Sequence, residues 1–206
     1  MTVATVGVPK ARTNKFVLCA CRLYFRCVIR KKTDEMARFR PPAPAEISYK
    51  GFRFLITDRP SDATMESYLQ ELKKHGVTDV VRVCEPSYDI TALQEAGIKV
   101  WNWFFADGSY PAEDILAKWF DLLKTRNREN PDACVAAHCI AGLGRAPVMV
   151  AVALIELGMP SEDAVELIRN KRRGAINAKQ LDYLNSYRPK SRLKVGKNGQ
   201  KDCCIQ

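Results

Sequence analysis

The stretch that most constrains this chain is "HCIAGLGRAP", which occupies residues 138–147. A short apolar segment, 134–137, precedes it, and an apolar run long enough for a buried helix, 146–157, follows it. The sequence therefore predicts a strand, a tight loop of small residues, and a helix that begins near Arg145. The loop places a thiol, Cys139, and a guanidinium at the two ends of a segment made mainly of backbone.

This loop has the features of an anion site with a nucleophile at its base. N–H groups at the start of a helix lack internal partners and carry the positive end of the helix dipole, and glycines let several of them point at one centre. The same field favours a thiolate at Cys139, and the planar fork of Arg145 can hold two phosphate oxygens. We therefore expect Cys139 to attack a phosphate held by the loop residues Ile140, Ala141, Gly142, Leu143, Gly144 and Arg145.

The loop resembles the signature of the cysteine-dependent protein phosphatases. The following Ala146-Pro147 narrows the resemblance to the phosphatases of regenerating liver, a prenylated branch of the dual-specificity group also called protein tyrosine phosphatase type 4A. The resemblance covers residues 36–206 and includes "RPPAPAEISYKGFRFLIT", "ELKKHGVTDVVRVCE", "RNKRRGAINAKQL" and "CCIQ". It implies a protein tyrosine or dual-specificity phosphatase that hydrolyses phosphomonoesters through a phosphocysteine, with no metal ion or other cofactor.

Phosphoryl transfer to a thiolate also needs a proton donor for the leaving oxygen. The candidate is Asp107 in "WNWFFADGSYP". From the residues alone an ordinary Asp-Gly turn is an equal explanation, but relatives carry their acid immediately before this glycine. Ala106 stands where they usually have a second acidic residue, and Phe104 where they have proline. Asp114 is the alternative acid, although its position fits the first turn of a helix.

The residue after the loop arginine departs from the pattern of most cysteine phosphatases. They carry Ser or Thr there, and the hydroxyl helps the thiolate leave in the second step, which Ala146 cannot do. The resemblance therefore implies a slow enzyme with a persistent phosphocysteine. It also leaves an alternative open, a phosphatase-fold binding module that regulates cyclin-M-type magnesium transporters, because family members bind the cytosolic domains of these transporters. Family members also associate at membranes, so a homo-oligomer is one alternative and the oligomeric state is left open.

A second cysteine, Cys84, follows a predicted strand, 77–83, as Cys139 follows 134–137. If these strands are parallel neighbours, their backbones lie ~4.8 Å apart, within the ~4.4–6.8 Å Cα separation of a disulfide. A small buried hydrophobe is the commonest role of a free cysteine. The family resemblance implies instead a reversible redox disulfide between Cys84 and Cys139.

The remaining pattern predicts an α/β fold in which strands alternate with helices. We expect strands at 46–49, 52–56, 77–83, 98–103 and 134–137, and helices around 65–72, 115–123, 146–157, 161–171 and 178–187. This order predicts a single cysteine-phosphatase domain with a central, mostly parallel twisted sheet and helices on both faces, and a site at the carboxyl ends of the strands. Asn177 and Gln180 predict a capping box on the last helix.

The cysteines and histidines argue against a metal site. The 8 cysteines contain no CxxC spacing and the chain has only 2 histidines, so no metal site is predicted. The cysteine spacing does not form a disulfide framework, which fits an intracellular, reducing compartment.

The carboxyl end of the chain predicts a membrane anchor. Cys203 begins "CCIQ", which matches a prenylation box, and basic residues upstream of it favour an anionic membrane surface. The formal net charge of +10 also admits nucleic-acid binding, but no aromatics interleave with the basic tail, so no nucleic acid is expected. The expected location is the cytoplasmic face of the plasma membrane and endosomal membranes, or the cytoplasm or nucleus without prenylation.

We therefore divide the chain into a basic extension at 1–35, a phosphatase domain at 36–188 and a polybasic tail at 189–206. The extension is predicted to be disordered, with Met36 as the usual family start, while a mitochondrial presequence or an acylated cysteine stays open. The substrate class, a phosphoprotein or a phosphoinositide, is also open at this point.

Overall fold

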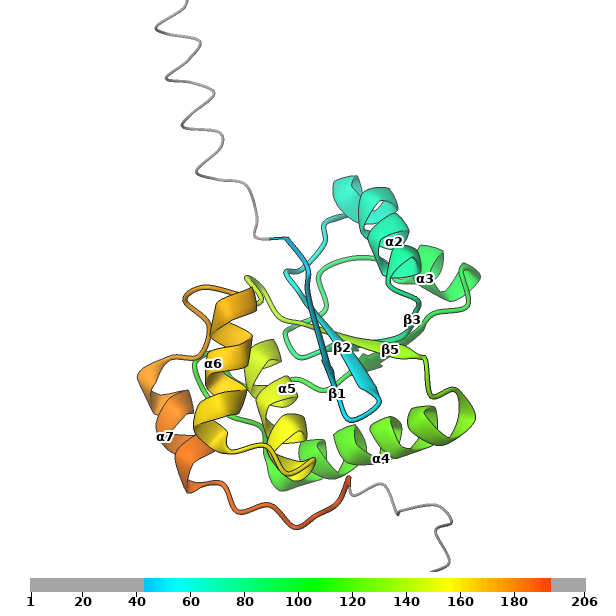
Figure 1. Cartoon of the computed structure of the whole chain (residues 1–206). Helices are drawn as coiled ribbons and strands as arrows, with labels where there is room; N and C mark the ends of the chain where they lie inside the picture. Colours follow the sequence, from blue (N-terminus) through cyan, green and yellow to red (C-terminus); the bar gives the residue numbers. More distant parts are fainter. Residues whose placement is uncertain (1–42, 194–206) are drawn as a thin grey trace, which may run out of the picture. The chain divides into compact units, whose positions relative to one another are not determined.

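Five strands form one mixed sheet in the order β1-β2-β5-β3-β4 in this computed structural model, which describes residues 43–193 (Figure 1). The strands are β1 (Ala45–Tyr49), β2 (Phe52–Thr57), β3 (Val77–Arg82), β4 (Lys99–Asn102) and β5 (Cys134–His138). The helices are α2 (Met65–Lys74), α3 (Thr91–Glu95), α4 (Glu113–Glu129), α5 (Arg145–Glu156), α6 (Ser161–Lys171) and α7 (Ala178–Ser186), and a 3-10 turn, η1, covers Asp62–Thr64.

The sheet is parallel except at one edge. β1 pairs with β2 in antiparallel register, whereas β2 and β3 run parallel to the central strand β5, and β4 runs parallel to β3. Thr57 and Arg82, the last residues of the flanking strands, both pair with His138 at the end of β5. The predicted mostly parallel sheet is confirmed, and three strand ends meet immediately before Cys139.

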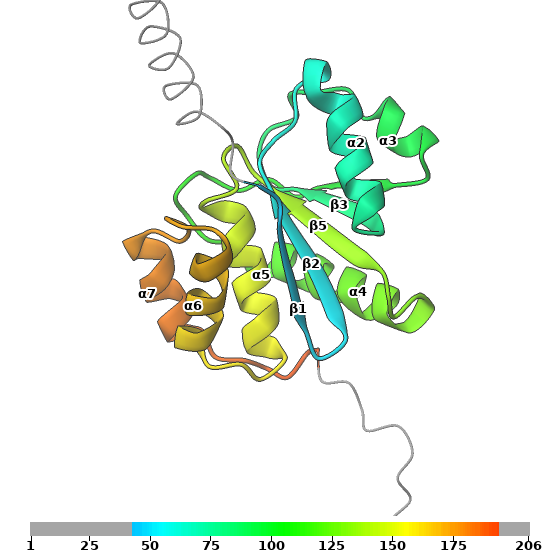
Figure 2. The ribbon, with the colours of Figure 1, turned by 45° about the horizontal axis from the view of Figure 1, so that its top comes forward.

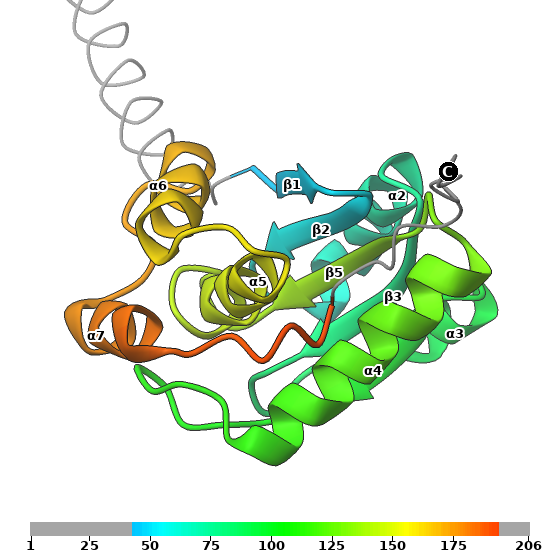
Figure 3. The ribbon, with the colours of Figure 1, turned by 60° about the horizontal axis from the view of Figure 1, so that its bottom comes forward.

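Helices cover both faces of the sheet (Figure 2). α2 and α3 pack on one face, and α4 and α5 pack on the other, where α6 and α7 lie against α5 (Figure 3). Alternation along β2 places Phe54 and Ile56 in the core of the α5 side and Leu55 in the core of the α2 side. α5 is buried along its whole length, as its continuous apolar run predicts.

The structure differs from the sequence prediction mainly in its short elements. The predicted strands and long helices are all present with ends within two residues, except that α4 continues six residues past the predicted end at 123, and α3 was not predicted. Five residues are too few to display a helical hydrophobic period, so only the burial of Leu93 gives α3 an inward face. The capping box is confirmed, because Asn177 Oδ1 accepts a hydrogen bond from Gln180 N (2.8 Å) and Gln180 Oε1 accepts one from Asn177 N (3.1 Å).

Within residues 43–193, no helix is both long and apolar enough to cross a bilayer. The predicted extension at 1–35 and the lipidation site Cys203 lie outside the described residues, so both stay predictions.

A buried ion pair joins β3 to α4. The Asp79 carboxylate is fully buried and accepts hydrogen bonds from Arg126, from Trp101 Nε1 (2.8 Å) and from Thr78 Oγ1 (2.7 Å). Burial alone would raise the pKa of Asp79, but these donors lower it overall. The carboxylate therefore stays ionised at neutral pH and depends on its partners for stability.

We predict that Arg126→Ala lowers the free energy of unfolding by about 3 kcal/mol at pH 7, because it leaves a buried carboxylate without its counter-ion. The double variant Asp79→Asn/Arg126→Leu should lose less. The folded-state pKa of Asp79 is depressed, so the wild-type contribution is present above the ordinary Asp pKa and is lost as the pH falls through the folded value. Urea titrations at pH 7 and pH 3 measure both effects, and an Arg126→Ala protein as stable as the double variant would contradict the account.

Candidate active site

The predicted loop lies at the carboxyl edge of the sheet, between β5 and α5. Cys139 is 3% exposed and Arg145 is 1% exposed, although the hollow in front of them has a volume of about 320 Å3. Most of its lining residues belong to this loop, to the loop that carries Asp107, and to the start of α7: Asp107, Gly108, Cys139, Ile140, Ala141, Leu143, Gly144, Gly174, Asn177 and Gln180. The structure thus brings the three predicted reacting residues to one place.

Within the loop, the carbonyl groups are hydrogen-bonded and the N–H groups are not. Each carbonyl from residue 139 to residue 144 accepts a hydrogen bond, in order from His138 Nδ1 (3.3 Å), Arg59 N (3.0 Å), Arg172 Nη2 (3.0 Å), Arg172 Nε (2.8 Å), Ile176 N (2.8 Å) and Val148 N (3.2 Å). Among the described residues, no N–H group from 140 to 145 has a hydrogen-bond partner. The loop therefore holds a set of unpaired donors beside the thiol, and an anion can satisfy them.

Arg172 supplies two of these carbonyl contacts and was not predicted from the sequence. It follows α6, is 1% exposed, and donates further hydrogen bonds to Ala43 O (3.0 Å) and Ile56 O (3.4 Å). Gly142, whose φ is +62°, sits against it, and a Cβ there would overlap Arg172 and the Thr57 carbonyl. Only glycine fits at this position, because Arg172 and the Thr57 carbonyl leave no room for a Cβ. The guanidinium in turn holds the loop carbonyls away from the hollow.

The Asp107 carboxylate contacts Arg145 beside the hollow. Arg145 Nη1 donates to Phe105 O (3.2 Å), and Arg145 Nε lies 3.1 Å from Asp107 Oδ1 as an ion pair without hydrogen-bond alignment. The buried Nε of Arg145 therefore has no hydrogen-bond acceptor, and a bound oxyanion can accept a hydrogen bond from it. The side chain of Asp107 is 77% exposed. Asp114, the alternative acid, instead pairs with Lys118 (3.6 Å) on the surface of α4.

A neutral histidine supports the base of the loop. His138 is fully buried, and its Nε2 lies 2.7 Å from the Tyr88 hydroxyl. Burial lowers the pKa of His138 to about 4, so the ring is uncharged at neutral pH. With Nδ1–H donating to the Cys139 carbonyl, Nε2 accepts from Tyr88, which fixes one tautomer. This arrangement fits a role in orienting the loop.

Cys84 and Cys139 lie on the same side of the sheet. β3 and β5 are adjacent and parallel, which is the condition that the pairing of these cysteines requires, and Val83 N donates to His138 O (3.1 Å) where the two segments leave the sheet. Both thiols belong to the core on the α5 side, whereas Cys134 belongs to the core on the α2 side. All three are free thiols, and burial raises the pKa of Cys84. No cluster of three or more potential metal ligands occurs among residues 43–193.

Sequence comparison shows the family of the chain. A family model described as "Polymorphic toxin system, DSP-PTPase phosphatase" matches residues 57–159. The chain is 60% identical to the PRL-1 phosphatase of Drosophila melanogaster over 163 residues, which cover 79% of this chain and 92% of that protein. It is 57% identical to protein tyrosine phosphatase type IVA 2 of Mus musculus over 166 residues, covering 80% and 98%.

Solved structures agree on the fold. A protein tyrosine phosphatase from Leishmania major superposes with a TM-score of 0.64 and 41% identity, covering 71% of this chain and 99% of that one. Kinase-associated phosphatase, with a serine in place of its catalytic cysteine, superposes with a TM-score of 0.59 at 22% identity, covering 76% and 99%. Fold and loop together define a cysteine-dependent phosphatase of the dual-specificity type. Within that class, the chain belongs to the type IVA protein tyrosine phosphatases, the phosphatases of regenerating liver.

We predict that Arg172→Lys weakens competitive inhibition by orthovanadate by at least ~10-fold, because a lysine cannot hold both loop carbonyls and each charge-assisted hydrogen bond contributes about 1.5–3 kcal/mol. The control is Arg173→Lys, an exposed neighbour that should bind vanadate as the wild type does. Thermal melting establishes that both variants are folded. Unchanged vanadate affinity in folded Arg172→Lys would show that the guanidinium does not set the loop.

Proposed function

We propose that this phosphatase hydrolyses phosphomonoesters, with phosphoproteins as its substrates, through a covalent intermediate on Cys139. The observation that carries the proposal is the hydrogen bonding of the loop: its carbonyls from 139 to 144 are all hydrogen-bonded, its N–H groups from 140 to 145 are unpaired, and Cys139 lies on the same hollow. Such a cradle favours three equatorial phosphate oxygens above the sulfur, and it strengthens as charge moves onto them. A phosphoinositide is the alternative substrate.

The reaction then has two balanced steps. Cys139 Sγ attacks phosphorus as the bond to the leaving oxygen breaks, and Asp107 gives that oxygen a proton. The Asp107 carboxylate next takes a proton from a water that attacks the phosphocysteine, which releases inorganic phosphate and the thiolate. Arg145 and the N–H groups of residues 140–145 hold the phosphoryl oxygens in both steps. No metal ion or other cofactor takes part in this scheme.

Ala146 limits the second step in this proposal. It is fully buried as the second residue of α5, directly after Arg145, and offers only a methyl group where a hydroxyl would assist the departing thiolate. A long-lived phosphocysteine follows. This same feature favours a second candidate function, a binding module for cyclin-M-type magnesium transporters. If Cys139→Ser retains transporter binding and its cellular effect, binding is the main output.

We further propose a redox switch between Cys84 and Cys139. Peroxide oxidises the Cys139 thiolate to a sulfenic acid, and the Cys84 thiol then displaces water to form the disulfide. The position of both thiols in one core at the ends of adjacent parallel strands supports this pairing over Cys134, which lies on the other side of the sheet.

Membrane attachment is proposed to rest on prenylation of Cys203 and on basic residues next to it. Lys190 and Arg192 form ion pairs with Glu113, so we assign the membrane contact to the basic residues that follow Leu193. This places the enzyme on the cytoplasmic face of plasma and endosomal membranes, where it can form homo-oligomers. Cell fractionation tests the assignment, since Cys203→Ser should move the protein to the soluble fraction.

We predict that Asp107→Asn lowers kcat/KM at least ~100-fold for a phosphate ester with a poor leaving group, and far less for an activated aryl phosphate, because only the poor leaving group needs the proton. Asp114→Asn is the matched control and should affect neither substrate. Equal losses with the two substrates would remove Asp107 from the role of general acid.

We also predict that mild peroxide links Cys84 to Cys139, abolishes activity, and is fully reversed by a dithiol reductant. In Cys84→Ser the nucleophile should be over-oxidised to a sulfinic acid and remain inactive. Peptide mapping of oxidised protein decides the matter, and a bond from Cys139 to Cys134, or recovery of Cys84→Ser equal to that of wild type, would refute the switch.

A further inference from the structure

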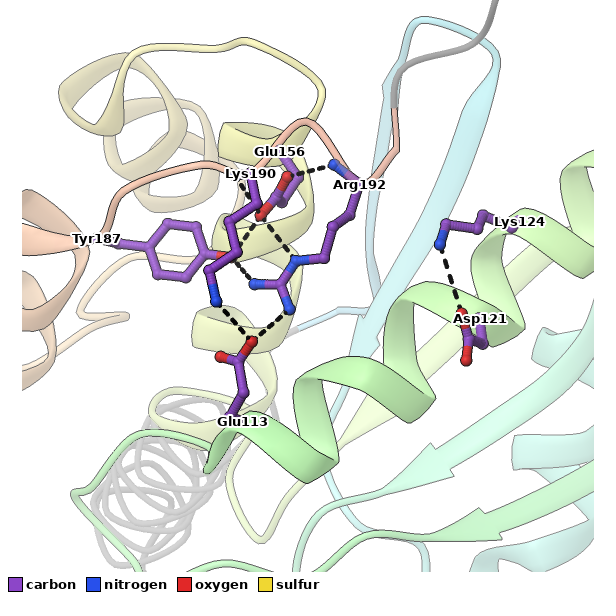
Figure 4. Close-up of polar contacts among 7 residues, drawn as sticks. All are labelled: Glu113, Asp121, Lys124, Glu156, Tyr187, Lys190 and Arg192. Atoms are coloured by element: carbon purple, nitrogen blue, oxygen red, sulfur yellow. Dashed lines mark hydrogen bonds and ion pairs between the residues drawn. The ribbon is translucent and has the colours of Figure 1, made fainter.

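A segment after α7, residues 187–193, is bound tightly to the domain, and we call it the C-terminal strap. Glu156 is its main anchor: the carboxylate accepts hydrogen bonds from Tyr187 Oη (2.6 Å), Lys190 N (3.1 Å), Arg192 N (2.7 Å) and Arg192 Nε (3.2 Å) (Figure 4). The contacts therefore continue past residue 188, where the sequence predicts that the domain ends.

Without the strap, an ionised Glu156 would be energetically unfavourable at its position. It is the last residue of α5, where the negative end of the helix dipole disfavours a carboxylate, and it is 1% exposed. Burial would raise the pKa of Glu156, but the strap donors lower it overall, which keeps the group ionised. The carboxylate and the strap thus stabilise each other.

Strap side chains also hold the start of α4. Arg192 Nη1 (2.7 Å) and Lys190 Nζ (3.0 Å) both donate to Glu113 Oε1 (Figure 4). The Arg192 guanidinium lies 4.5 Å from the ring centre of Phe120, also on α4, and Leu193 is 2% exposed. Glu113 is the first residue of α4, so these ion pairs fix the point where the loop carrying Asp107 ends.

α7 holds the middle of that same loop, residues 103–112, which we call the acid loop. Three contacts at consecutive loop residues make this connection: Asn177 Nδ2 donates to Gly108 O (3.2 Å), Gln180 Nε2 donates to Ser109 O (2.9 Å), and the ring of Tyr110 stacks on that of Tyr183, with centroids 4.1 Å apart and planes within 1°. Tyr183 in turn packs against Tyr187, the first residue of the strap, with a centroid separation of 6.0 Å.

We propose that α7 and the C-terminal strap form one clasp that holds the acid loop closed over the hollow, with Tyr110 and Glu113 as positioning residues for Asp107. α7 contacts the acid loop immediately after Asp107, and the strap contacts Glu113 where the loop ends. The Asp107 carboxylate therefore stays beside Arg145 without a bound phosphate. The inference rests on the proposed role of Asp107 as the general acid. It adds that the chain segment leading toward the predicted membrane anchor also sets the position of that acid.

The test uses the exposed partners of the clasp, which can be changed without opening the core. We expect Tyr110→Ala and Glu113→Ala each to lower kcat/KM ~10-fold for the poor leaving group used with Asp107, and less than ~3-fold for the activated aryl phosphate. Tyr110→Phe keeps the stack and should behave as the wild type. Asp121→Ala is the matched control for Glu113, because Asp121 forms an exposed ion pair with Lys124 on the same helix (Figure 4).

A second measurement separates positioning from general damage. The rate of Cys139 alkylation by iodoacetate should not fall in Tyr110→Ala and Glu113→Ala, because the loop of residues 139–145 is intact and a released acid loop leaves the thiol at least as accessible. If Asp107→Asn discriminates between the two leaving groups and the clasp variants do not, the clasp has no role in positioning. If Asp107→Asn itself fails to discriminate, the proposed general acid is wrong instead.

Discussion

The rest of the site depends on the hydrogen bonds that Arg172 donates to carbonyls of the phosphate loop, residues 139–145. A peptide plane has two ends, so turning the carbonyls of Ala141 and Gly142 toward the guanidinium turns the neighbouring N–H groups toward the hollow. Burying a guanidinium is unfavourable, and burial lowers the pKa of Arg172, but four hydrogen bonds to carbonyls compensate. The anion site is therefore organised before any anion arrives, which is the condition for electrostatic catalysis.

α5 carries this organisation through the domain. Its N-terminus is the phosphate site, and its C-terminus is Glu156, so a helix of 12 residues, roughly 18 Å long, has one buried charge at each end. Arg145 contacts the acid loop directly, through Asp107. Glu156 is connected to the end of that loop through Arg192 of the strap, which forms ion pairs with both Glu156 and Glu113. The apolar middle of the helix packs on the sheet and α6 and keeps the two ends at a fixed separation. The loop of residues 139–145, the acid loop and the strap are thus connected by contacts at the two ends of α5.

The elements that sequence reasoning predicted are those with a strong local signal. The loop from Cys139 to Arg145, the mostly parallel sheet and the capping box at Asn177 follow from residue type and spacing, whereas the order of the strands does not. Arg172 and the strap could not be predicted this way, since both act through contacts between residues 30 to 129 positions apart, and their sequence alone has the composition of an ordinary basic surface. Asp107 falls between these cases: the residues alone left an ordinary turn open, and the contact with Arg145 places it at the site.

The central claim is that Cys139 carries a phosphoryl group during turnover and releases it slowly because Ala146 has no hydroxyl. Rapid acid quenching followed by mass spectrometry of the Cys139 peptide tests this directly. The account predicts that phosphocysteine accumulates in the wild type and decays slowly, while Ala146→Ser turns over faster and accumulates less of it. Turnover of substrate with no phosphocysteine detected, or an equal lifetime of the intermediate in the two proteins, would contradict the account.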